Sequence, residues 1–127
     1  MHPHLHFMEL QKKQEKRREA QDVSFVNNHL RVLIQELKRY VNKEDYKEDV
    51  RKLTRHIGHV DLWNVRYLNF LEDPRVALAQ GVLAWRIIER EEIPYKNRER
   101  NKVERLIRML GHVDWNYAVE FNRLTRA

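Results

Sequence analysis

Apolar residues that recur alternately at three and four positions run through most of the chain. The clearest series contains Val23, Val26, Leu30, Leu33, Leu37 and Tyr40. This spacing places the side chains along one side of an α-helix, and its heptad form is typical of helices that pack lengthwise on other helices. The series therefore predicts a helix over about residues 22–42 with one buried face.

Glycine and proline, which supply the turns of strand-rich proteins, are scarce, with 3 of each in 127 residues. Together with the helical spacing, this scarcity predicts an all-α fold. We expect six helices, over about residues 22–42, 45–57, 62–71, 75–91, 96–110 and 115–126. The fourth is apolar on most of its circumference and is therefore the expected central helix.

The tetrapeptide Gly-His-Val-Asp occurs twice, at residues 58–61 and 111–114, an offset of 53 residues. Aligning residues 50–71 with 103–124 without gaps gives nine identities in 22 positions. A period of this length indicates a repeated supersecondary unit. We therefore predict one helical domain over residues 22–127, built as a bundle of two related three-helix units, 22–73 and 74–127.

The repeated tetrapeptide suits the turn between two helices. Gly58 and Gly111 each follow an apolar helical pattern, where a left-handed residue often ends a helix. Asp61 and Asp114 each precede the next helical pattern, where a carboxylate caps the first turn. We therefore interpret both copies as structural turns.

A metal site is the functional alternative to a structural turn, since His56, His59 and Asp61 are closely spaced. His56 is replaced by Met109 in the second copy, however, so the ligand set is not repeated. His59 and His112 have no evident structural role, and their function stays open. A DNA-reading helix-turn-helix is disfavoured because residues 62–67 offer only an Asn and an Arg for reading base edges.

The first 21 residues form a polar N-terminal extension. Continued upstream, the heptad register places only charged residues on the core side: Glu9, Lys12, Lys16 and Glu19. We expect this extension to be helical or mobile and to contribute little to the core. The heptad series itself leaves open a homodimer through the helix 22–42.

Positive charge is concentrated on one side of the fifth helix. The chain carries a formal net charge of +6, and at 100° per residue one face of this helix has four cations and no acid. These are Arg98, Lys102, Arg105 and Arg108. The equivalent positions of the first unit have mixed charge: Asp45, Glu48, Asp49, Lys52 and Arg55.

Cations spaced along a helix can neutralise successive phosphates and release counterions, which gives sequence-independent binding of DNA or RNA. The N-terminal extension supplies four further candidate contacts: Lys12, Lys13, Arg17 and Arg18. No aromatic residues are interleaved with the cations of the fifth helix to form a stacking platform for single strands, and Tyr95 and Tyr117 are the nearest candidates. We therefore expect a nucleic-acid-binding protein, a small subunit or regulator of a nucleoprotein assembly.

The alternative is a protein-binding adapter or inhibitor that acts through an exposed helical surface without nucleic-acid contact. Its candidate contact residues are exposed aromatic side chains such as Trp63, Tyr67 or Trp115. Exposed aromatic patches of this kind commonly mark protein interfaces.

Catalysis finds little support in the sequence. The chain has no Cys, no Gly-rich phosphate loop and no Glu/His pair at metal-binding spacing. We expect no catalytic, cofactor or metal site. The longest run without Asp, Glu, Lys or Arg is ten residues, Val76–Trp85, and the first residues do not resemble a signal peptide. We therefore expect a cytoplasmic protein with no membrane contact.

Overall fold

The computed structural model describes residues 3–57 and 71–126, and within these ranges it is helical with no strand. Its elements are α1 (Pro3–Leu37), the 3₁₀ turn η1 (Lys38–Tyr40), α2 (Lys43–Ile57), α3 (Pro74–Arg90), α4 (Lys96–Val113) and α5 (Trp115–Thr125). The predicted all-α class is confirmed. The third expected helix lies almost wholly outside the described residues, as does the first tetrapeptide, so the six-helix count and the duplication stay predictions.

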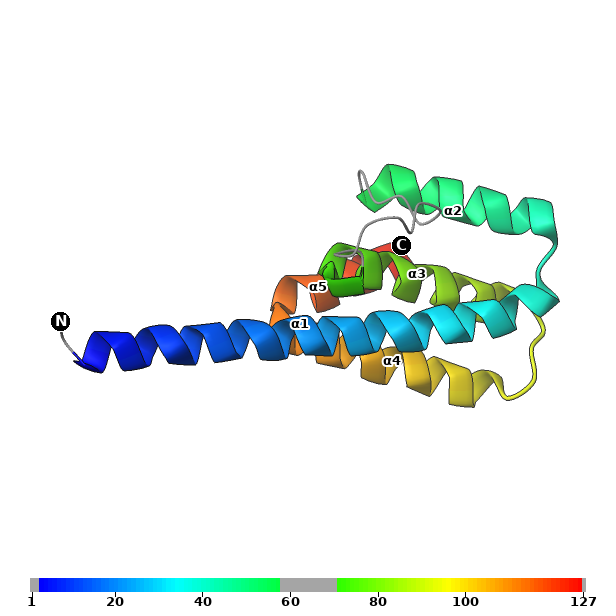
Figure 1. Ribbon diagram of the computed structural model, residues 1–127. Helices are drawn as coiled ribbons and strands as arrows, with labels where there is room; N and C mark the ends of the chain where they lie inside the picture. The colour runs from blue at the N-terminus through cyan, green and yellow to red at the C-terminus, as the bar shows by residue number, and fades with distance from the viewer. Residues whose placement is uncertain (1–2, 58–70, 127) are drawn as a thin grey trace.

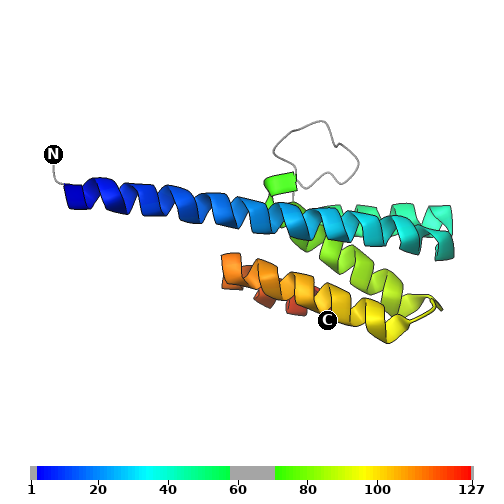
Figure 2. The same ribbon diagram turned by 60° about the horizontal axis from the view of Figure 1, so that its bottom comes forward.

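The long helix α1 begins at Pro3, so the start predicted near residue 22 is wrong. The N-terminal extension, expected to be helical or mobile, is helical from Pro3 onward. At 1.5 Å per residue its 35 residues span about 52 Å. Residues 5–19 are all exposed, and the N-terminal half projects past the other helices (Figures 1 and 2). Residues with good helix propensity carry the helix through this segment without any packing partner.

The apolar series of α1 packs on α3 and α4 of the same chain. Five of its members are at most 3% exposed: Val23, Val26, Leu30, Leu33 and Leu37. Tyr40 is 44% exposed, because α1 ends at Leu37 and the chain continues in the 3₁₀ turn η1. The predicted buried face is thus confirmed for this helix over its α-helical part.

Helix α3 lies at the centre of the bundle and packs on α1, α2, α4 and α5. Its buried side chains surround the helix, as its apolar circumference predicts. At Gly81 an added Cβ would lie 2.6 Å from Cδ1 of Ile107, so the missing side chain lets α3 and α4 approach closely. This close crossing brings the inner face of α4 against the core.

The turn into α3 is held by polar contacts that the sequence analysis did not identify. The Asp73 side chain accepts a hydrogen bond from the backbone N–H of Arg75 at 2.9 Å and caps the helix. The buried amide of Asn27 donates to the carbonyl of Leu71 at 2.7 Å. These contacts tie the start of α3 to α1.

The turn between α4 and α5 confirms one prediction and corrects another. Asp114 caps α5, since its side chain accepts from the backbone N–H of Asn116 at 2.9 Å. Gly111, predicted to end the helix in a left-handed conformation, instead lies inside α4, which continues to Val113. An added Cβ there would lie 3.1 Å from that of Ala118, so Gly111 lets α5 fold back closely on α4. Gly58, His59 and Asp61 lie outside the described residues.

Candidate nucleic-acid interface

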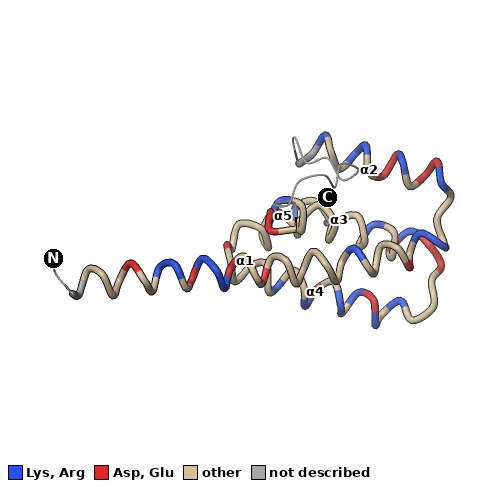
Figure 3. The backbone as a smooth tube through the Cα atoms, in the orientation of Figure 1, with Lys and Arg blue, Asp and Glu red and all other residues tan. Residues whose placement is uncertain are grey.

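The outer face of α4 carries the four predicted cations. Arg98, Arg105 and Arg108 are exposed and Lys102 is half-buried. The opposite face of α4 is buried against α1, α3 and α5 through residues that include Val103. Lys and Arg recur along the length of this helix at the edge of the bundle (Figure 3). The structure therefore presents the predicted basic face to solvent.

Two of these cations share one acidic partner. Glu99 is 5% exposed, and Nη2 of Arg98 lies 3.1 Å from its Oε1 while Nζ of Lys102 lies 3.6 Å from its Oε2. The Arg98 guanidinium also covers the ring of Tyr95, with 4.4 Å to the ring centroid. These contacts hold both cations in place and neutralise part of their charge.

The C-terminal half of the basic face is different. Within the described part of the chain, Arg105 and Arg108 form no ion pair and no side-chain hydrogen bond. Among the described residues no carboxylate lies within ion-pair distance of either guanidinium, although Glu104 is next to Arg105 in the sequence and four residues before Arg108.

A groove of about 440 Å³ lies beside Arg108, between α4 and α5. Its walls include Trp85 of α3 together with Trp115 and Phe121 of α5. The rings of Trp85 and Phe121 meet edge to face, with centroids 5.8 Å apart and an interplanar angle of 80°. The Trp115 side chain is the most exposed large hydrophobic group among the described residues, at 73%. Aromatic surfaces and basic side chains are thus combined in one place.

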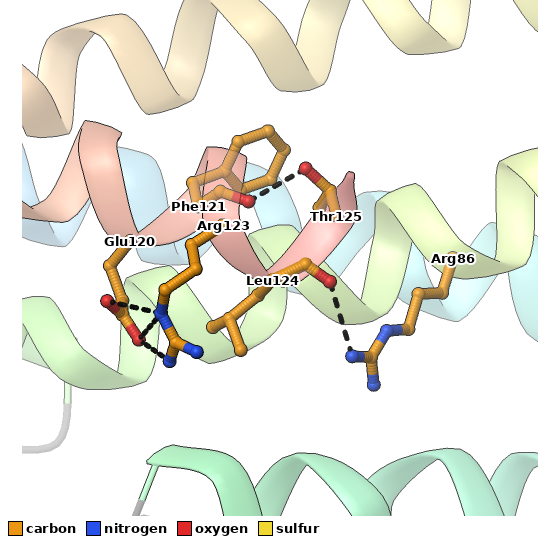
Figure 4. Close-up of polar contacts among 6 residues, drawn as sticks. All are labelled: Arg86, Glu120, Phe121, Arg123, Leu124 and Thr125. Carbon is orange, nitrogen blue, oxygen red and sulfur yellow. Dashed lines mark hydrogen bonds and ion pairs between the residues drawn. The ribbon is translucent and has the colours of Figure 1, made fainter. Parts of the chain in front are cut away.

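Two hydrogen bonds are made at the end of α5, one to α3 and one within α5 (Figure 4). Arg86 of α3 donates from Nη2 to the carbonyl of Leu124 at 3.4 Å. The Thr125 hydroxyl donates to the carbonyl of Phe121 at 2.7 Å. Arg126, the next residue, also lines the groove.

The acidic residue of α5 is paired within the same helix. Arg123 hydrogen-bonds the carboxylate of Glu120, as Figure 4 shows, and this contact lowers the pKa of Glu120 while it raises the pKa of Arg123. Neither residue lines the groove. The pair leaves no net charge on this part of α5.

The second predicted group of cations is not brought to the face of α4. Lys12, Lys13, Arg17 and Arg18 are exposed on the part of α1 that no other helix covers. In both ribbon views this part of α1 projects past the C-terminal end of α4 (Figures 1 and 2). The two basic groups thus form separate surfaces.

The aromatic residues of the groove were missed in the sequence. Tyr95 and Tyr117 are adjacent to α4 along the chain, but neither lines the groove. The Arg98 guanidinium lies over one face of the Tyr95 ring, and the residue remains 69% exposed. Tyr117 packs against the core, where burial raises its pKa. Trp115 was considered only as a protein contact. Its position beside Arg108 results from the antiparallel return of α5, which residue spacing along one helix does not reveal.

Within residues 3–57 and 71–126, no group of three or more His, Cys, Asp or Glu side chains is arranged to hold a metal ion. His112 is exposed and lines the groove. None of the helices in these ranges is long and apolar enough to cross a membrane. No protein-family model matches the chain, and no curated protein or solved structure is significantly similar to it.

Proposed function

We propose that this is a non-enzymatic nucleic-acid-binding protein that contacts the phosphate backbone through the outer face of α4. The observation that carries the proposal is the pair Arg105 and Arg108, which are exposed about one helical turn apart without an acidic partner in the described part of the chain. Guanidinium groups bind phosphate oxygens in a fork geometry, and their contacts displace condensed counterions. This combination supports binding to DNA or RNA without sequence readout.

Arg98 and Lys102 extend the same row toward the start of α4. They share the carboxylate of Glu99, so these three residues retain one positive charge. Because the carboxylate is buried and each cation is partly exposed, the positive ends face solvent. A nucleic-acid backbone that contacts Arg105 and Arg108 would continue along Arg98 and Lys102, where the net positive charge of the face is lower.

The projecting part of α1 supplies a second candidate contact. Its cations Lys12, Lys13, Arg17 and Arg18 are interspersed with Glu9, Glu15 and Glu19, all exposed. A lone helix with this composition has no packing role, and its positive groups can reach phosphates beyond the footprint of α4. We propose that the protein acts in the cytoplasm as a small subunit or regulator of a nucleoprotein assembly.

A matched pair of double variants tests this proposal. The change Arg105→Glu with Arg108→Glu inverts the unpaired half of the α4 face. The change Lys52→Glu with Arg55→Glu alters net charge equally on α2, where both side chains are exposed. We expect the α4 variant to lose binding to a labelled DNA duplex and the α2 variant to retain it, as measured by fluorescence anisotropy. Equal binding by both variants would contradict the proposal.

The alternative, a protein-binding adapter or inhibitor, is favoured by a different observation, the 73% exposure of Trp115. Large aromatic side chains are enriched at the centres of protein interfaces. The projecting end of α1 adds four exposed apolar residues: Leu5, Phe7, Met8 and Leu10. This alternative predicts no nucleic-acid binding by the wild type at about 0.15 M salt. A homodimer through the helix 22–42 would use its outer face, since the heptad series is buried within the chain.

A further inference from the structure

We infer that the groove between α4 and α5 binds an unstacked base of a single-stranded nucleic acid. This inference rests on the proposed phosphate-binding function of α4 and specifies its ligand. The groove is an aromatic recess that directly adjoins the unpaired half of the basic face, because Arg108 belongs to both.

The shape and lining of the groove suit a planar aromatic ligand. Its volume of about 440 Å³ lies within the usual range of small-ligand sites. Trp85 and Phe121 form one fixed edge-to-face pair, while the indole of Trp115 is 73% exposed and free to accept a stacked ring. Every nucleic-acid base has a face that stacks on an aromatic side chain.

The charges of the groove indicate that the ligand is anionic. Arg108 and Arg126 lie at its rim, and neither forms an ion pair within the described residues. Among the described residues that line the groove, Glu104 is the only acidic one. A base in a strand is flanked by phosphates on both sides, so its own backbone supplies the negative charge that the two arginines complement.

The exposed Asn122 amide adds a polar group that can both donate and accept hydrogen bonds. This group suits the edge of a base, which presents donors and acceptors in one plane. In a duplex that edge is paired and both base faces are stacked. The groove therefore fits a base that a single strand leaves free.

Binding to intact and abasic single strands tests this inference. The probes are an oligodeoxythymidylate of about 15 nucleotides, which covers the site size of small single-strand-binding domains, and an abasic strand with the same number of phosphates. We expect wild type to bind the intact strand about tenfold more tightly than the abasic strand. We expect Trp115→Ala to abolish this preference and Trp115→Phe to restore part of it, because a phenyl ring still stacks.

The matched control is Val119→Ala, since Val119 is 49% exposed on the same helix but does not line the groove. It should keep the wild-type preference. Thermal unfolding of each variant checks the fold, which Trp115→Ala should leave intact because the side chain is mostly exposed.

The outcomes separate this inference from the proposed function. Equal affinity of the wild type for the intact and the abasic strand would overturn the base site but not phosphate binding by α4. A preference for the intact strand that is unchanged in Trp115→Ala would have the same consequence. Binding to neither strand nor to a duplex would overturn both. If the groove binds an acidic peptide with an aromatic residue but binds no nucleic-acid strand, the base site is wrong and the groove is a protein contact.

Discussion

The guanidinium of Arg90 in α3 forms two parallel hydrogen bonds to the carboxylate of Asp49 in α2, at 2.7 and 2.8 Å. The Asp49 side chain is 8% exposed, and the contact raises the pKa of Arg90. In the described residues α2 packs mainly on α3. This ion pair therefore links α2 to the central helix of the bundle.

Replacing Arg90 with Met should destabilise the protein, because it leaves the Asp49 carboxylate buried without its partner. We expect a loss of about 2 kcal/mol in the free energy of unfolding, measured by urea denaturation, which is less than for a fully buried pair because the Arg90 side chain is 41% exposed. Adding Asp49→Asn should recover part of this loss, since it removes the uncompensated charge. Wild-type stability of the single variant would show that Asp49 reaches solvent without Arg90.

Removing the cap of α5 should have a smaller effect. Asp114→Ala takes away the acceptor for the Asn116 N–H and should cost about 1 kcal/mol of stability. His112 is exposed and two residues away, so His112→Ala should lower the stability much less. Thermal unfolding of both variants measures the difference. Loss of nucleic-acid binding by the His112 variant at unchanged stability would assign His112 a functional role.

The pKa of Glu120 should respond to its partner on α5. The hydrogen bond from Arg123 lowers this pKa below its ordinary value near 4.5, so Arg123→Ala should raise it. Nuclear magnetic resonance titration of the carboxyl carbon measures the change. In the wild type the pair contributes stability above the ordinary pKa of Glu120, and this contribution is lost as the pH falls through the lowered value. The contribution is small because water screens the pair.

Deleting residues 1–20 should leave the melting temperature nearly unchanged, because residues 5–19 are exposed and most of this segment projects past the other helices (Figure 1). The same deletion should weaken binding to nucleic acid, since it removes Lys12, Lys13, Arg17 and Arg18. A large drop in melting temperature would instead indicate that this segment docks on its own chain or on a second copy.

The buried faces of the helices could be predicted because an apolar stripe has to be covered. The spacing of Val23 and its partners indicates such a stripe, and α3, α4 and α5 begin within about a residue of their predicted positions. The start of α1 could not be predicted in this way. The loss of an apolar stripe upstream of Val23 shows only that packing ends there, while helix propensity continues to Pro3.

The basic face of α4 could be predicted because it depends on angular spacing within one helix. The difference between its two halves could not be predicted, because the pairing of Arg98 and Lys102 with the buried Glu99 depends on how the surrounding helices pack. Trp115 and Arg108 line one groove because α5 returns closely on α4 at Gly111. The sequence pattern predicts a helix end at Gly111, and from that prediction the close packing of α5 on α4 that forms the groove does not follow.

The salt dependence of duplex binding tests most directly whether α4 contacts phosphates. For four contacts the plot of log affinity against log salt concentration should have a slope on the order of −3 to −4 in the wild type. In the Arg105→Glu, Arg108→Glu variant any residual binding should have a slope shallower by about two units, whereas Lys52→Glu with Arg55→Glu should leave it unchanged. A wild type that binds neither duplex nor single strand at low salt, or the same slope in all three proteins, would contradict the proposed function.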